Sequence, residues 1–438
     1  MSKSIVVEKK YLLPFILVTS LFFLWGVPND LTNPMVEVFK NVLDISNSKA
    51  SLVQFAFYGG YGTMAIPAAL FIRKYRYSTG ILIGLGLFFA GSILMYPATQ
   101  LTNYNFVLVS LYVLTFGLAF LETTANPMVL AMGDPKTATL RLNLAQAFNP
   151  MGALTGQFIA KALVKDKLYT QMDGTLSEAS SSLAKEDVIF HDMNVVSYPY
   201  ILVGFIVLAI FVMFVLKKVD VQKNAEEALD MSATLKKLFS NKNYYEGVIT
   251  QFFYVACQIM VWTYIYQYVT ALNVTRSPEN QLDATVYVYA STICFLSARW
   301  ICTFLMRYIS SAKLMLIMAL LGSTFMTYAI ISDTILGLYS LVAVSFCMSL
   351  MFPTIYGLAL QNMGDEAKLG SAGLILGIVG GAVMPLFQGM VIDVGGKGLS
   401  DSLFFGFIPE IRFSFVIPLF CLVIVAIYCL RTLKRSKA

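Results

Sequence analysis

Charged residues are scarce in this sequence. Asp, Glu, Lys and Arg make up 13% of its 438 residues, whereas hydrophobic residues make up 58% and the mean hydropathy is +0.71. A water-soluble protein of this length cannot bury so much apolar surface. The shortage of charge therefore excludes a soluble globular protein and predicts an all-α integral membrane protein.

Histidine is almost absent, and the six cysteines follow no metal-ligand spacing. His191 is the only histidine, and the sequence contains neither a CxxC nor an HExxH motif. Because no nucleophile with a base and no set of metal ligands is present, we exclude a membrane-embedded enzyme and expect neither a cofactor nor a metal. The cysteines are expected to be small buried apolar residues. A proton that crosses the membrane must therefore be carried by a carboxyl group.

Twelve apolar segments are long enough to cross a bilayer, whose core needs roughly 20 helical residues. An even number of helices places both termini on one side, and the short loops of that side hold most of the basic residues. The positive-inside rule makes that side the cytoplasm, so the net charge of +6 indicates topology in the inner (plasma) membrane and not nucleic-acid binding. The segments run over residues 12–40, 51–72, 80–100, 105–132, 140–163, 197–216, 245–272, 284–306, 314–332, 334–362, 369–394 and 413–433.

A polar stretch divides the chain near its middle. We expect an N-terminal half at residues 1–216, a cytoplasmic linker at 217–242 and a C-terminal half at 243–438, with six helices in each half. Weak repeats at a common offset of roughly 230 residues favour a duplicated unit: FFLW and QFFY, IRKY and LMRY, and two copies of MGD. Two pseudosymmetric halves are expected to leave a cavity between them near the midplane, where transporters bind their substrates.

The stretch FFLWGVPNDLTNPMVEVF places a carboxyl group inside an apolar segment. Asp30 lies there beside Asn29, with Asn33 on the same helix face by its i, i+3 spacing. A carboxylate in the bilayer costs on the order of 2.5 to 3.5 kcal/mol on insertion scales, so we expect Asp30 to face a partner or an aqueous cavity. The alternative is a solvated, structural Asp30 near the outer mouth.

A second acid, Glu122, lies in the fourth apolar segment within FLETTANP, and Asn126 follows one turn later on the same face. Intramembrane carboxyl groups serve as proton relays in pumps and transporters, so Glu122 is a candidate proton carrier. Arg299 is the main further charge within the apolar segments. We expect its long side chain to reach the inner interface.

Amide and aromatic side chains gather on the segments expected to face these acids. Gln146 and Asn149 lie three residues apart, and Gln258 and Trp262 share one stripe. Neutral amides that donate and accept hydrogen bonds, next to flat aromatic faces, suit a polyhydroxylated ring. An anionic substrate would need a central Arg or Lys, which the sequence does not place there. The alternative for any single amide is that it joins helices across the bundle.

Five strings occur in order along the chain: FFLWGVPNDLTNP, QFAFYGGY, FIRKYRYSTG, FLETTANP and RLNLAQAFNPMGA. Together they closely resemble the fucose:proton symporters of the major facilitator superfamily. The resemblance implies a 12-helix major facilitator fold, alternating access and import of L-fucose driven by the proton gradient. It also implies that Glu122 carries the coupling proton and that an acid in the first helix contacts the sugar.

The sequence departs from this family at two places. Aligned through Trp25, the aspartate of the family's first helix falls on Asn33, and Asp30 takes a position where the best-known members have asparagine. We expect the sugar-contacting acid to be retained, displaced by about 5 Å along the same helix face. Phe352 stands before Pro353 where the resemblance predicts a tyrosine, which removes one hydroxyl contact.

The predicted protein is a monomer in the lipid bilayer that binds a small sugar and uses no cofactor, with the proton as coupling ion. Two alternatives stay open: a sodium-coupled or broader hexose transporter for glucose or galactose with the same fold, and a sugar sensor that does not transport. Glu122 and Asp30 are the predicted coupling acids. The predicted substrate contacts are Trp25, Asn29, Asp30, Asn33, Asn126, Gln146, Asn149, Gln258, Trp262 and Phe352.

Overall fold

The chain is almost entirely helical. Eleven helical stretches in the described part of the chain are long and apolar enough to cross a membrane, so the protein is a multi-pass membrane protein. Within the described residues, the one sheet is a short antiparallel pair of strands, β1 (Leu403–Phe404) and β2 (Ile408–Pro409). The computed structural model describes residues 6–32, 35–45, 47–50, 52–170, 177, 183–217, 231–274, 276–392, 394, 403–406 and 408–436.

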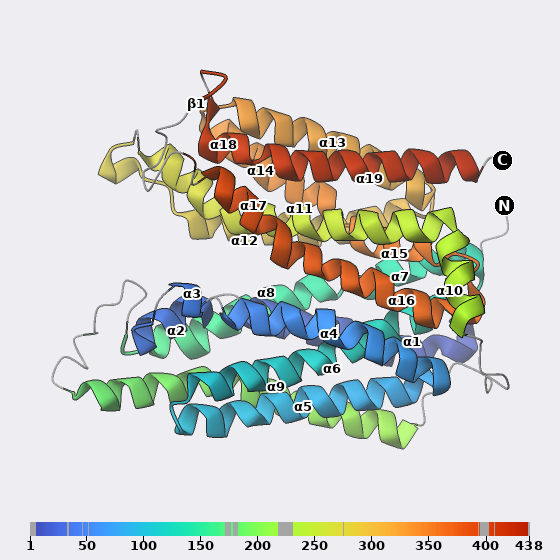
Figure 1. Cartoon of the computed structure of the whole chain (residues 1–438), viewed down its shortest axis with the longest axis horizontal. Helices are drawn as coiled ribbons and strands as arrows, with labels where there is room; N and C mark the ends of the chain where they lie inside the picture. The colour runs from blue at the N-terminus through green and yellow to red at the C-terminus, as the bar shows by residue number, and fades with distance from the viewer. Residues whose placement is uncertain are drawn as a thin grey trace.

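The N-terminal helices form one bundle, drawn from blue to green in the lower part of Figure 1. α6 packs against α4, α5 and α7, α5 also contacts α9, and α1 packs along α8. The helices are α1 (Leu12–Thr32), α2 (Met35–Leu43), α3 (Asn47–Ala50), α4 (Leu52–Lys74), α5 (Tyr77–Gln100), α6 (Tyr104–Leu130), α7 (Ala138–Gln146), α8 (Asn149–Ile159), a π-helical continuation (Ala160–Val164) and α9 (Lys185–Lys217).

The C-terminal helices form the second bundle, above the first in Figure 1. α11 packs against α15, α17 and α19, and α13 against α14 and α19. The helices are α10 (Met231–Ser240), α11 (Lys242–Asn273), α12 (Ala284–Leu305), α13 (Ser311–Ile331), α14 (Ile335–Met348), α15 (Met351–Ala359), α16 (Ala367–Leu376), a 3₁₀ turn (Gly377–Val379), α17 (Gly380–Ile392), α18 (Glu410–Ser414) and α19 (Val416–Arg435).

The fifth predicted span is interrupted. It consists of α7 and α8, between which the N–H groups of Ala147 and Phe148 bond three residues back instead of four. Pro150 follows in the first turn of α8 and has no N–H for a continuous α-helical ladder. The pair α7 and α8 is not among the eleven apolar candidates in the described residues, some of which also combine separate helices, and it supplies the twelfth crossing of the 12-helix fold.

The sixth span begins earlier than the sequence predicted. α9 starts at Lys185 instead of residue 197, so His191, which precedes the predicted span, lies in a helix. The side chain of Asp192 is fully buried and accepts hydrogen bonds from the N–H groups of Tyr169 (2.7 Å) and Thr170 (2.9 Å). The polar first turns of α9 hid this extension from a prediction based on apolar runs. Residues 218–230 of the predicted linker at 217–242 lie outside the described residues, and α10 occupies most of the rest.

The two bundles meet at the end of the molecule nearer both termini (Figure 1), where α7 contacts α15 and α16 contacts α4 and α6. The Nδ2 of Asn143 donates to the hydroxyl of Thr354 at 3.2 Å across this contact. Gly357 faces Thr139 so closely that an added Cβ would lie 3.1 Å from the Thr139 Cα. The helices are in backbone-level contact at this end.

Candidate substrate cavity

A cavity lies between the two bundles, lined by α1, α4, α6, α7 and α8 of the first and by α11, α12, α15 and the 3₁₀ turn of the second. It contains about 1030 Å³ of space free of atoms, including its opening. Nine of the eleven predicted site residues line it: Trp25, Asn29, Asp30, Glu122, Gln146, Asn149, Gln258, Trp262 and Phe352.

Two predicted site residues are not among those that line the cavity. Asn33 lies outside the described residues. Asn126 is fully buried behind the wall, where its Nδ2 donates to the carbonyl oxygen of Glu122 and its Oδ1 accepts from the Nε2 of Gln146, both at 2.8 Å. Asn126 therefore supports Gln146 from behind and does not occupy the predicted position of a sugar contact.

Glu122 projects from α6 into the cavity and is 6% exposed. The hydroxyl of Tyr61, from α4, donates a hydrogen bond of 2.9 Å to its Oε1. The partner of this acid is thus a neutral phenol, and none of the described residues places a cation in contact with the carboxyl group. In such a site the ionised form of Glu122 carries a large desolvation free energy, so its protonation state affects the stability of the surrounding structure.

Asp30 is positioned by close packing of α1 on α8. A Cβ at Gly26, Gly152 or Gly156 would overlap backbone atoms of the facing helix, so these glycines permit the approach. As a result Gln157 of α8 reaches Asp30, and its Nε2 donates to the Asp30 Oδ1 at 2.8 Å. The same nitrogen lies 3.3 Å from the hydroxyl of Thr292 in α12, which links the two bundles.

Arg299 lines the cavity, so the prediction that it extends to the inner interface is wrong. Its side chain is buried: the Nε donates to the Ser349 hydroxyl at 3.2 Å and the Nη1 to the backbone oxygen of Gln146 at 3.3 Å. The guanidinium also lies over the ring of Phe295, 5.1 Å from its centroid. The expectation that the cavity holds no central cation is corrected by the same observation.

Flat aromatic faces enter the cavity from both bundles. Trp262 of α11 donates a hydrogen bond of 3.1 Å from its Nε1 to the Ser345 hydroxyl. Its ring also packs against the Phe295 ring, with the ring centroids 5.1 Å apart. Trp25 of α1 packs on Phe22 with the ring centroids 4.4 Å apart. Rigid indole faces on opposite walls suit stacking on the apolar face of a sugar ring.

The comparisons with known proteins agree with this architecture. A family model described as the Major Facilitator Superfamily matches residues 15–385. The chain belongs to the major facilitator superfamily. It is 48% identical to the L-fucose-proton symporter of Haemophilus influenzae over 99% of both chains, and 29% identical to the Glucose/galactose transporter of Brucella abortus over 96% of this chain and 94% of that one. A crystal structure of a major facilitator superfamily transporter in the outward conformation superposes with a TM-score of 0.83 at 29% identity, covering 97% and 99% of the two chains.

Among the residues that the sequence analysis missed or misplaced are Gln157, which bonds to Asp30, and Thr292 and Arg299, which line the cavity. Gln157 lies eight residues after Asn149 and so on the same face of α8, which is a helical signal that could have found it. Thr292 lies seven residues before Arg299 and so on the same face of α12. For Arg299 the sequence gives only a charge within an apolar segment, and only packing shows which way it points.

Proposed function

We propose that this protein is a proton-coupled symporter that imports L-fucose, or a related deoxyhexose or hexose, by alternating access. In this proposal it acts as a monomer in the inner membrane with both termini in the cytoplasm. The observation that carries the proposal is that Asp30 and Glu122 line one cavity together with neutral amides and two tryptophans. The 48% identity to a protein named L-fucose-proton symporter supports the choice of sugar.

The charges of the cavity support coupling to a proton. Asp30 and Glu122 contribute −2 and Arg299 contributes +1, so the lining sums to −1 with both acids ionised and to zero once Glu122 is protonated. Closing the cavity over an unbalanced charge costs more desolvation energy than closing it over a set whose charges sum to zero. Protonation of Glu122 therefore lowers the barrier to closure, and an anionic substrate would meet repulsion in the unprotonated state.

A hydrogen-bonded chain connects Glu122 with the second bundle. Asn126 donates to the Glu122 backbone oxygen, Gln146 donates to Asn126, and Arg299 of α12 donates to the Gln146 backbone oxygen. In the proposed cycle, sugar enters from outside and binds Asp30, the amides and the indole faces. Protonation of Glu122 then permits the bundles to rock about this contact and to release sugar and proton inside.

The direct test is to add L-fucose to lightly buffered cells that express the protein and to record external pH, with galactose, arabinose and glucose as comparisons. We expect L-fucose to alkalinise the medium and a protonophore to abolish accumulation. Uptake that required sodium and resisted the protonophore would instead support the sodium-coupled alternative, and glucose or galactose as the preferred sugar would match the name of the Brucella relative.

Replacement of Glu122 by glutamine tests the proton carrier. Glu122→Gln keeps the shape and a hydrogen-bond acceptor for Tyr61 but holds no exchangeable charge. We expect uphill accumulation of sugar to be lost while sugar binding and counterflow persist. Glu279→Gln, at an exposed position, is the matched control and should accumulate sugar normally. Uphill uptake by the Glu122→Gln protein would refute the assignment.

A further inference from the structure

A second pocket lies between the ends of α11 and α19, on the face of the molecule where both termini lie and apart from the central cavity. It contains about 690 Å³ of space free of atoms, including its opening. α11 contributes Lys242, Tyr245 and Glu246, and α19 contributes Arg431, Lys434 and Arg435. Four cations and one carboxylate give the lining a net charge of +3.

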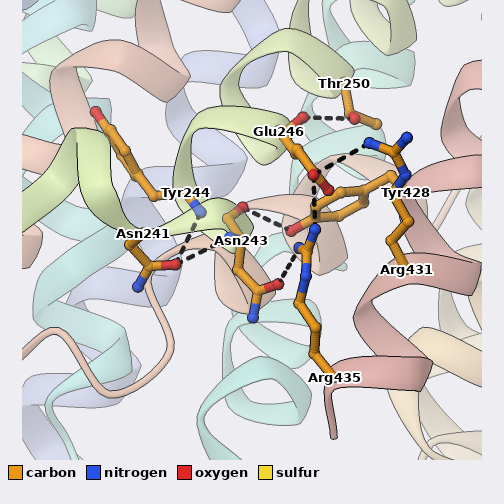
Figure 2. Close-up of polar contacts among 8 residues, drawn as sticks. All are labelled: Asn241, Asn243, Tyr244, Glu246, Thr250, Tyr428, Arg431 and Arg435. Atoms are coloured by element: carbon orange, nitrogen blue, oxygen red, sulfur yellow. Dashed lines mark hydrogen bonds and ion pairs between the residues drawn. The ribbon is translucent and has the colours of Figure 1, made fainter.

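Glu246 holds the two guanidinium groups of the pocket in place (Figure 2). Its Oε1 lies 3.2 Å from the Arg431 Nη1 and 2.6 Å from the Arg435 Nη2, and Arg435 also donates to the Oδ1 of Asn243 at 2.6 Å. The Tyr428 hydroxyl, about one turn before Arg431 on α19, donates to the Asn243 backbone oxygen of α11 at 3.3 Å and so joins the two helices. One carboxylate thus orders two arginines but neutralises only one of the four cations.

The pocket lies where the exposed helix faces change from apolar to cationic. On α19, Ile427 and Leu430 are 45% and 47% exposed. Arg431 lies four residues after Ile427, and Lys434 lies four residues after Leu430. On α11, the exposed Ile249 lies one turn beyond Tyr245. A side-chain face that turns from apolar to cationic within one helical turn marks the level of lipid headgroups.

We propose that this pocket binds the phosphate-bearing headgroup of an anionic phospholipid, with the acyl chains along the exposed apolar faces of α11 and α19. Arginine forks and lysine ammonium groups are the side chains that bind phosphate, and basic pockets at the membrane interface attract anionic lipids. The positive-inside bias alone requires basic residues near helix ends. It does not require four of them, from helices about 190 residues apart in sequence, to converge on one pocket around a shared carboxylate.

The test uses the full-length protein, purified in detergent and stripped of lipid, with retained lipid counted by native mass spectrometry. Phosphatidylglycerol and phosphatidylcholine of matched acyl chains are titrated separately, and phosphatidylglycerol is also titrated with inorganic phosphate present. We expect tight retention of phosphatidylglycerol, weak retention of phosphatidylcholine and no competition by millimolar phosphate. The double variant Lys242→Gln/Lys434→Gln should bind phosphatidylglycerol on the order of tenfold more weakly.

The double variant is expected to fold, because both lysines are exposed and neither forms an ion pair within the described ranges. Lys136→Gln/Lys313→Gln removes the same charge from exposed positions outside the pocket and should retain phosphatidylglycerol like the unsubstituted protein. Equal retention of the two lipids, an unchanged affinity of the pocket variant, or an equal loss in the control variant would overturn the proposal. Competition by free phosphate would also overturn it, because the occupant would then be a soluble anion.

Discussion

The two cavity acids differ in the partners that hold them. Glu122 receives a hydrogen bond from Tyr61, within its own bundle. Asp30 receives one from Gln157, whose Nε2 also contacts Thr292 of the other bundle. The charge of Asp30 therefore acts at a contact between the bundles. Any sugar hydroxyl bound by Asp30 would be placed next to both halves at once.

Neutralising Asp30 should weaken sugar binding without unfolding the protein. Asp30→Asn keeps an oxygen that accepts from Gln157, but a neutral acceptor binds a hydroxyl less strongly than a carboxylate. We expect the dissociation constant for L-fucose to rise about tenfold, as measured by quenching of tryptophan fluorescence. Asp44→Asn is the matched control, since Asp44 is exposed and pairs with Lys185 far from the cavity. Unchanged affinity in Asp30→Asn would show that this acid does not contact the sugar.

At the scale of helices, glycines decide how the cavity wall is built. Gly26 on α1 and Gly152 and Gly156 on α8 lie against backbone atoms of the opposite helix. Without side chains at these positions the two helices approach closely, which van der Waals packing in membranes favours. This contact brings Gln157 to Asp30 and Asn149 to the backbone oxygen of Phe22. The placement of the cavity's polar residues thus depends on residues that carry no polar group.

A methyl group at Gly152 should separate these helices. The Cβ of Gly152→Ala would overlap the backbone oxygen of Phe23, which cannot rotate away. We expect a loss of about 1 to 3 kcal/mol in stability, seen as a lower thermal midpoint in detergent, together with weaker sugar binding. Gly86→Ala is the control, because a Cβ there would meet no atom within 4 Å. A Gly152→Ala protein as stable as the control would show that the seam between α1 and α8 can relax.

At the scale of the whole molecule, the bundles touch most closely at the end nearer the termini. Asn143 bonds to Thr354 there, and Gly357 rests on Thr139. In alternating access this contact must open when the opposite end closes, so its strength helps to set the balance between the two states.

Weakening this contact should favour the state open toward the termini. In Gly357→Ala the new Cβ would lie 2.8 Å from the Thr139 hydroxyl oxygen, which pushes α15 away from α7. We expect L-fucose affinity to fall a few-fold in right-side-out vesicles and to rise in inside-out vesicles. Gly59→Ala is the control, because its Cβ would meet only the Tyr112 ring at 3.8 Å. An equal change of affinity in both vesicle types would contradict a shift between states.

Much of the fold and nine of the residues that line the cavity followed from the sequence. Apolar length predicted twelve crossings, and the rarity of charge inside them singled out Asp30 and Glu122, because a buried carboxylate is tolerated only beside a cavity or a partner. Helical spacing then gathered Gln146, Asn149, Gln258 and Trp262 on inward faces. These inferences depend on local composition and on a fixed helical period, both of which a single sequence carries.

Tertiary structure alone decided how side chains pair across helices. Asn126 turned behind the wall, where it donates to Glu122 of its own helix and accepts from Gln146 of α7. Arg299 turned into the cavity, because its acceptors lie on other helices. The break between α7 and α8 and the glycine contact that brings Gln157 to Asp30 likewise depend on neighbours distant in sequence. Composition tells which residues the bilayer cannot accept. Packing determines which partner each of them finds. The packing energy arises from the contact between two helices and cannot be assigned to either helix alone.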